Sequence, residues 1–269
     1  MQEENFSHNK NDASVFWDGT KAEVQKNLHV LFQDRFERMR KTGYDEAEIQ
    51  EIMENMLSRE RSFLTRILLQ IEHARTEHGE GRELIVLFDI DETIGAGEIL
   101  EDNTVRTILR PSLIPLLQTI TAQGAKIGFI STRSVEAMQK QLGEAQNLAP
   151  IRQYIDKNYI YSPGRNESSI SFRSYEELAA ACKQKFGGAI GIIDDSRIGG
   201  EKDGDPDPDA YPDSGDLDKL AVLERARPDF EEKIIVVVDD IKYPKFLNNK
   251  NGFYGVPLQE GDEGRFFKP

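Results

Sequence analysis

The feature that most constrains the fold is the apolar run at residues 84–88, Leu-Ile-Val-Leu-Phe, which leads directly into Asp89 and Asp91. Five consecutive residues of this kind are typical of a strand covered on both faces, as in parallel α/β sheets. Ligands of such sheets bind beyond the carboxyl ends of the strands, where Asp89 and Asp91 follow. Two carboxylates this close repel each other unless a positive charge lies between them, and a divalent metal ion would supply it. The sequence therefore predicts an acidic reaction centre at the end of a buried strand.

Further apolar runs alternate with helical patterns downstream of this strand. A helix is expected from Ser112, whose hydroxyl suits an N-cap, to Gly124, and other helices are expected after Ser134 and Ser174. Alternation of strands and helices is typical of a doubly wound parallel sheet, and we predict this α/β class for residues 81–260. The expected strands are residues 84–88, 126–131, 159–161, 189–193, 234–238 and 252–256.

The residues before this core are predicted to form a flexible N-terminus, 1–18, and a helical extension, 19–80. A capping-box pattern at 20–23 opens one amphipathic helix, and Asp45 opens a second after a break at Gly43. The two helices are expected to form a hairpin that either lies on the core or covers the site. Amphipathic stripes of this kind are more typical of internal packing than of a partner surface.

The composition limits the partners of the chain. Its 269 residues are enough to bury one large core, and its net charge of -14 argues against nucleic acid or an anionic membrane as a partner. The first residues lack the basic and apolar segments of a signal peptide, and no apolar run is long enough to span a membrane. We expect a cytoplasmic protein with a short tail at 261–269, and secretion by a route that reads other signals is the alternative.

An acidic insertion is expected at about residues 197–216. From Asp205 onward, acids occupy positions 1, 3, 5, 9 and 12 of a calcium-binding loop. However, Ala210 stands where such a loop needs glycine, and Pro206 and Pro208 stiffen its first half. A mobile acidic loop is therefore favoured over a calcium site.

Four short stretches, taken in order, resemble the motifs of the haloacid dehalogenase superfamily over about residues 83–258. They are residues 88–93, the strand end at Ser131, Lys219, and the pair Asp239-Asp240. The resemblance implies a Rossmann-like core and, because Asp91 is present, a phosphatase or phosphotransferase rather than a dehalogenase. Only about thirty residues separate Thr93 from Lys126, which leaves no room for a large cap there.

The resemblance implies a role for each acid. Asp89 would be the nucleophile that becomes an aspartyl phosphate, and Asp91 would protonate the leaving oxygen and later activate water. Mg²⁺ would be the cofactor, held by a carboxylate oxygen of Asp89, the main-chain carbonyl of Asp91 and the carboxylate of Asp239. Asp240 would lie next to the metal site and support the residues that bind the ion.

The polar and basic residues complete the expected site. By the same resemblance, Ser131 would donate a hydrogen bond to the phosphoryl group, and Lys219 would neutralise its charge and that of the nucleophile. Thr132 and Arg133 follow Ser131 directly and are expected to contact the substrate. For Arg133, a place on the surface of the next helix is the alternative.

The sequence leaves three alternatives open. Either Asp194-Asp195 or Asp239-Asp240 is the fourth motif, and we favour the second because Lys219 lies twenty residues ahead of it, which leaves room for one helix. The phosphorylated substrate is a small molecule or a protein, since family members with little cap often accept phosphoproteins. A function from another class is that of a catalytically weak protein that keeps the fold and binds a protein partner through residues 19–80.

Overall fold

The core of the protein is a five-stranded, all-parallel sheet with the strand order β5-β4-β1-β6-β7. The computed structural model describes residues 5–79, 81–99, 105–132, 135–162, 219–223, 226–240, 244, 247 and 252–257. The strands are Leu84–Phe88 (β1), Lys126–Ile130 (β4), Ile155–Tyr161 (β5), Ile234–Asp239 (β6) and Phe253–Pro257 (β7). The predicted parallel α/β sheet is confirmed. The expected strand at 189–193, the helix after Ser174 and the acidic segment 203–216 lie outside the described residues.

Strand β1 lies at the centre of the sheet, and all of its residues are buried. Its even-numbered residues pack into one apolar cluster with the N-terminal helices, and its odd-numbered residues pack into a second cluster with residues from 220 to 230. The sheet is therefore covered on both faces. This explains why the β1 sequence is apolar throughout rather than alternating with polar residues.

The order of the strands reverses beside β1. The chain winds outward from β1 through β4 to β5, and it then crosses to β6 on the other side of β1 and continues to β7. In sheets of this kind the ligand site lies at the carboxyl ends of the strands where the order reverses. Asp89 follows β1, and its N–H donates to the carbonyl of Val238 in β6 at 3.0 Å, so the ends of these two strands lie side by side.

The first helix, α1 (Asn5–Lys41), begins earlier than the sequence predicted. Residues 5–18 were expected to be flexible, but they belong to this helix. Thr20 was expected near its N-terminus, yet the Thr20 hydroxyl lies within the helix and donates to the carbonyl of Phe16 one turn before, at 2.9 Å. A threonine that bonds back in this way is satisfied inside a helix, so the capping-box pattern is not a helix start here.

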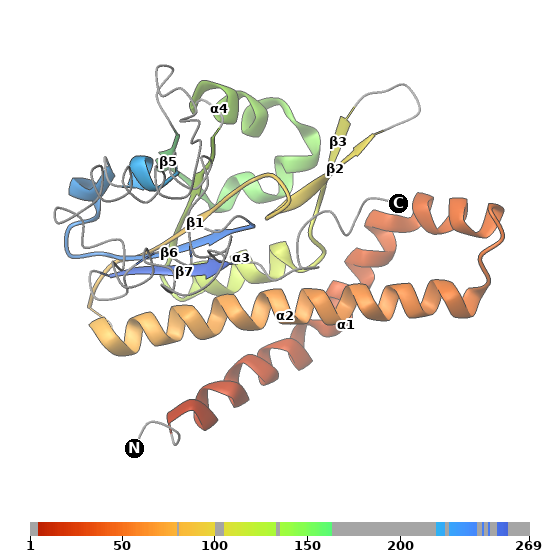
Figure 1. The fold of residues 1–269 in the computed structure, drawn as a ribbon, viewed down its shortest axis with the longest axis horizontal. Helices are drawn as coiled ribbons and strands as arrows, with labels where there is room; N and C mark the ends of the chain where they lie inside the picture. The colour runs from red at the N-terminus through yellow and green to blue at the C-terminus, as the bar shows by residue number, and fades with distance from the viewer. Residues whose placement is uncertain are drawn as a thin grey trace, which may run out of the picture.

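The second helix, α2 (Glu46–His78), begins as predicted. The Asp45 side chain accepts from the backbone N–H of Glu48, and the Glu48 side chain accepts from the N–H of Asp45, which completes a capping box. Helix α2 packs against α1, β6 and β7, and Figure 1 shows it running along one side of the sheet. The hairpin of α1 and α2 thus lies on the core.

The apolar stripes of both helices are internal packing, as predicted. Three polar contacts fix the helices further: Asn27 Nδ2 donates to the carbonyl of Pro111 at 3.1 Å, Arg75 donates to that of Gln123 at 2.6 Å, and Glu77 accepts from the Tyr254 hydroxyl. Most of the stripe residues are buried: Val24, Leu28, Phe32, Phe36, Ile49, Met53, Met56, Leu57, Phe63, Leu64, Ile67 and Ile71.

A two-stranded antiparallel hairpin of β2 (Gly95–Ile99) and β3 (Val105–Leu109) follows the β1 loop, where only a short connection was expected. Figure 1 shows it projecting away from the main sheet. Helix α3 (Leu113–Ala122) comes next and ends before Gly124, whose φ of 84° suits a residue without a side chain. Ser112 occupies the N-cap position, but its side chain makes no capping bond and donates to Glu60 instead.

The other elements around the sheet are helix α4 (Val135–Glu144), the 3₁₀ helices η1 (Gln146–Tyr154) and η4 (Arg227–Phe230), and helical residues 219–223. Leu220 and Leu223 from the last of these belong to the second apolar cluster, so this segment covers the face of the sheet opposite α2. Within the part of the chain that the structure describes, no helix has the length and apolar character of a membrane span.

Candidate active site

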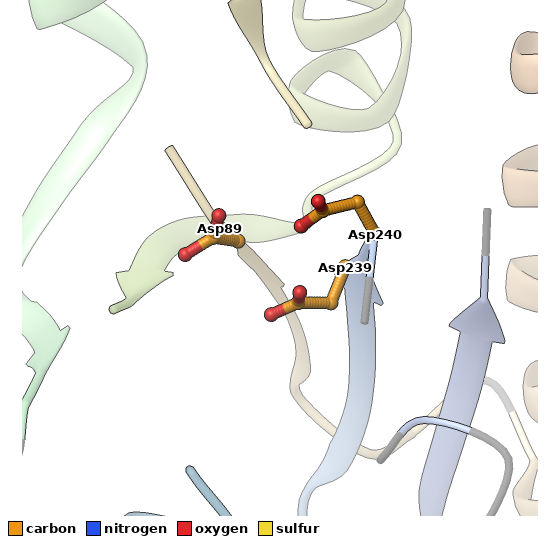
Figure 2. Close-up of side chains that lie close together, drawn as sticks. All are labelled: Asp89, Asp239 and Asp240. Carbon is orange, nitrogen blue, oxygen red and sulfur yellow. The ribbon is translucent and has the colours of Figure 1, made fainter. Parts of the chain in front are cut away.

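Three carboxylates gather at the carboxyl ends of β1 and β6. One oxygen each from Asp89, Asp239 and Asp240 lies within 4.8 Å of the others (Figure 2). The pairing of Phe88 with Val238 in the two strands brings the acids that follow them together. Asp89 and Asp239 are buried, whereas Asp240 is partly exposed. The parallel sheet thus assembles an acidic centre from residues far apart in the sequence.

Lys219 supplies a positive charge to this centre. Its Nζ lies 2.9 Å from Oδ1 of Asp89 and 2.6 Å from Oδ2 of Asp239, and its side chain is 5 % exposed. Burial alone would lower the pKa of Lys219, but attraction to Asp239 and then to Asp89 outweighs burial and raises the pKa. The lysine is therefore charged at neutral pH and bridges the two acids.

One lysine does not balance the surrounding carboxylates. Burial and then the charge of Asp239 raise the pKa of Asp89 to about 7, against the opposing effect of Lys219. Burial and then the charge of Asp89 likewise raise the pKa of Asp240. A group of acids that resists full ionisation attracts a further cation. Lys219 alone therefore does not neutralise the carboxylates of Asp89, Asp239 and Asp240.

The donors at this centre suit a hard divalent cation. Carboxylate oxygens are the ligands that Mg²⁺ and Ca²⁺ prefer, and around Mg²⁺ oxygens on opposite sides lie about 4 Å apart. The three oxygens of Asp89, Asp239 and Asp240 lie within 4.8 Å of one another, so small side-chain shifts would let all three bind one ion. The residues present therefore fit such a cofactor.

Asp91 has a different environment from Asp89. Strand β1 ends at Phe88, so the extended backbone, in which residues two apart point to the same face, does not continue through Asp89 to Asp91. The chain bends instead: Glu92 has a φ of 59°, in the left-handed region, and the N–H of Ile94 donates to the carbonyl of Ile90 at 3.3 Å. Asp91 is exposed, and its carboxylate is not among the three that converge.

The expected phosphate-binding residues lie at the end of the neighbouring strand β4. Ser131 follows β4, is buried, and donates its N–H to the carbonyl of Tyr161 at 3.1 Å. Because β4 pairs with β1, Ser131 stands at the same edge of the sheet as Asp89. Thr132 is exposed, and Arg133 lies outside the described residues.

Of the two candidates for the fourth motif, the structure brings Asp239 and Asp240 beside Asp89. Asp194 and Asp195 lie outside the described residues, as does the acidic segment with the calcium-loop pattern. Thr93, in the turn after β1, is buried, and its hydroxyl lies 3.5 Å from Oδ1 of Asp240.

Two residues beside the site were missed from the sequence. Nε of Arg110 donates to the carbonyl of Thr93 at 2.7 Å, and its Nη1 pairs with Oε1 of Glu60 in α2 at 2.9 Å. The guanidinium also lies 4.2 Å from the ring centre of Phe63. Glu60 interrupts the apolar stripe of α2 between Leu57 and Phe63, and a charged residue in such a place is a signal of a buried partner.

The site pairs the buried Asp89 with Lys219 and places Asp239 and Asp240 beside them. The exposed carboxylate of Asp91 follows in the next loop. Such an arrangement can bind a divalent cation and can present a carboxylate to an electrophile. No protein-family model, no curated protein and no solved structure matches the chain. A proposal for its function therefore rests on its own residues and their geometry.

Proposed function

We propose that the protein is a Mg²⁺-dependent phosphomonoester hydrolase of the haloacid dehalogenase type, which acts through an aspartyl phosphate. The observation that carries this proposal is the convergence of Asp89, Lys219 and Asp239 at one end of the parallel sheet. These residues come from three separate segments whose order along the chain matches that family's motifs. A chance cluster of solvated acids would not include a buried lysine at 2.6 Å and 2.9 Å from two of them.

Asp89 is the nucleophile in this proposal. One of its carboxylate oxygens attacks phosphorus, and an O–P bond forms while the P–O bond to the leaving alcohol breaks. Lys219, at 2.9 Å from the carboxylate, favours the ionised form of Asp89 and offsets the charge of the phosphoryl group. Asp239, whose Oδ2 lies 2.6 Å from the same ammonium, holds it in place.

Asp91 transfers the proton. Its exposed carboxyl gives a proton to the departing alkoxide, and in the second half of the reaction it takes a proton from the water that attacks the phosphorus of the aspartyl phosphate. Inorganic phosphate leaves and Asp89 is restored. The contrast between buried Asp89 and exposed Asp91 suits these roles, because solvent water can reach Asp91.

Mg²⁺ would be held by carboxylate oxygens of Asp89, Asp239 and Asp240, together with the main-chain carbonyl of Asp91. The bound cation would supply charge stabilisation to the phosphoryl group and compensate the three acids. Ser131 and Thr132, at the end of β4, would contact the phosphoryl oxygens, with Arg133 next in sequence as a further contact. The substrate is a phosphomonoester, either a small molecule or a phosphoprotein.

Hydrolysis of an aryl phosphate, with and without Mg²⁺, tests the proposal in three proteins. Wild type and the control Asp34→Asn, which changes an exposed acid on α1, should show equal metal-dependent turnover. Asp89→Asn should show none, because an amide cannot form the aspartyl phosphate. Equal turnover by Asp89→Asn and wild type would exclude the mechanism. If wild type hydrolyses neither the aryl phosphate nor a phosphopeptide, the protein-binding alternative would replace the enzyme.

A further inference from the structure

A buried ion pair connects the N-terminal helices with the loop that carries Asp91. Glu60 comes from the middle of α2 and Arg110 from the residue after β3, and their side chains are 3 % and 2 % exposed. Burying two charges costs so much desolvation that apolar residues of the same size are often as stabilising or more so. Stability alone therefore does not explain why charged residues occupy these two buried positions.

Arg110 fixes the backbone of the loop that follows β1. Its side-chain Nε donates to the carbonyl of Thr93 at 2.7 Å, and its own N–H donates to the carbonyl of Ile94 at 2.9 Å. Two successive carbonyls are thus held by one residue. The loop needs such support because Glu92, the residue before Thr93, has a φ of 59°, a conformation that costs free energy for a residue with a side chain.

The loop in turn contacts an acid of the metal-binding cluster. Thr93 is fully buried, and its hydroxyl donates to Oδ1 of Asp240 at 3.5 Å. Asp240 is the most exposed of the three clustered acids and the one with the fewest constraints from the sheet, since it follows the end of β6. The position of Thr93 therefore bears directly on how the Asp240 carboxylate is oriented.

Glu60 orients Arg110 from a rigid element. Its carboxylate accepts from Arg110 at 2.9 Å, from the N–H of Ser112 at 3.2 Å and from the Ser112 hydroxyl. These three donors fix the carboxylate, and α2 is fixed by its apolar face against β6 and β7. A continuous path of hydrogen bonds thus runs from α2 through Arg110 and Thr93 to Asp240.

We propose that Glu60 and Arg110 are positioning residues of the reaction centre, which hold Thr93 so that the Asp240 carboxylate stays directed at the cation shared with Asp89. The part of this inference that concerns turnover rests on the proposed phosphatase function, and the part that concerns metal binding does not. Residues that orient metal ligands from outside typically contribute about 10-fold to 100-fold to metal affinity or activity.

The test replaces the ion pair by apolar residues of similar size. The double variant Glu60→Leu with Arg110→Met leaves no buried charge without a partner, so it should still fold. Its Tm in thermal unfolding without metal should be lower than that of wild type, because the Ser112 N–H and hydroxyl and the Thr93 carbonyl lose their hydrogen-bond partners. Calorimetry should show Mg²⁺ binding about 10-fold to 100-fold weaker, and kcat for the aryl phosphate should fall by a similar factor at unchanged KM. The control Glu46→Gln breaks a surface pair with Arg40 at 2.6 Å and should change none of these values.

A second variant covers the case in which the double variant does not fold. Arg110→Lys keeps a positive charge for Glu60 but lacks the planar fork that reaches both Glu60 and Thr93. Weaker Mg²⁺ binding in this variant supports the proposal, and wild-type binding in either folded variant overturns it.

The two proposals fail in different ways. If wild type binds Mg²⁺ and the double variant binds it weakly, but neither hydrolyses phosphate esters, the proposed function is wrong and the positioning role of Arg110 holds. If wild type turns over and the double variant matches it in kcat and in Mg²⁺ affinity, the function holds and the positioning role is wrong. Absence of Mg²⁺ binding in wild type would overturn both.

Discussion

Asp89→Asn should stabilise the metal-free protein, and the gain should grow with pH. The pKa of Asp89 rises from the ordinary 3.8 to about 7 because the carboxyl is buried and lies beside Asp239. Between these two pH values the folded protein keeps a proton that the unfolded chain has lost, so the stability of wild type falls as the pH rises. Asparagine has nearly the same shape and cannot ionise, so the variant escapes this loss.

The size of the effect follows from the two pKa values. At about 1.4 kcal/mol for each pKa unit, ionisation of Asp89 costs the folded protein about 4 kcal/mol once the pH exceeds the folded-state value. At about pH 5 part of this cost is already present, so the stability gap between variant and wild type should widen by about 2–3 kcal/mol from about pH 5 to about pH 8. The attraction between Lys219 and the carboxylate, 2.9 Å apart, lowers the folded-state pKa of Asp89 and is already included in its value of about 7.

Urea unfolding at several pH values, with a chelator present, measures this gap directly. Asp34→Asn is the matched control, since it removes an exposed acid from α1 and should show no gap that changes with pH. With Mg²⁺ in place of the chelator, wild type should gain stability and Asp89→Asn should gain less, because one ligand is lost. A gap that stays constant or shrinks between pH 5 and pH 8 would show that Asp89 is ionised without cost, and the charge shortage inferred for the site would then be wrong.

Other perturbations test further parts of the structure. Lys219→Met removes the buried ammonium between two acids and should lower the free energy of unfolding of the metal-free protein by about 3–5 kcal/mol in urea. Mg²⁺ should restore part of this loss. An unchanged urea midpoint would contradict the ion pairs at 2.6 Å and 2.9 Å. Asp239→Asn should weaken Mg²⁺ binding in calorimetry at least about 10-fold while Asp194→Asn leaves it unchanged, and the reverse result would assign the fourth motif to Asp194. Gly128→Ala places a Cβ 2.0 Å from the carbonyl oxygen of Tyr159 on the neighbouring strand, so thermal unfolding should show a loss of at least about 1–3 kcal/mol, and an unchanged Tm would argue against this close approach.

The parallel sheet was predictable because its three central strands, β4, β1 and β6, are nearly continuous apolar runs. A strand buried on both faces needs no alternation with polar residues, so length and composition identify it, as for β1, β4 and β6. The hairpin of β2 and β3 carried no such signal. It begins Gly-Ala-Gly, residues that disfavour strands, and it pairs outside the main sheet.

Caps were harder to predict than strands, because their side chains have competing partners. Asp45 and Glu48 cap α2 as their spacing indicates, since both are exposed and only the local backbone is in reach. Thr20 bonds back along α1 instead. Ser112 donates to Glu60, fifty-two residues away, rather than to its own helix. A local motif therefore predicts a cap only where the side chain has no competing hydrogen-bond partner, either in its own helix or elsewhere in the fold.

Much of the candidate site follows from topology. Once the runs before Asp89 and Asp239 are taken as neighbouring parallel strands, both acids must stand at the same edge, and Lys219 can reach them from the preceding helix. The difference between buried Asp89 and exposed Asp91 was not predictable, because it depends on the turn at Glu92. The pair of Glu60 with Arg110 spans fifty residues and has no signal beyond a charge in an apolar stripe.

The packing of α2 against β6 and β7 also has a consequence for the order in which the chain folds. The helical hairpin is synthesised first, but the strands that its apolar face covers lie near the end of the sequence. At about 5–20 residues per second, on the order of 10 s or more pass before β7 leaves the ribosome. During that time the buried face of α2 has no sheet to cover, so a nascent chain paused before β6 should be a strong chaperone substrate.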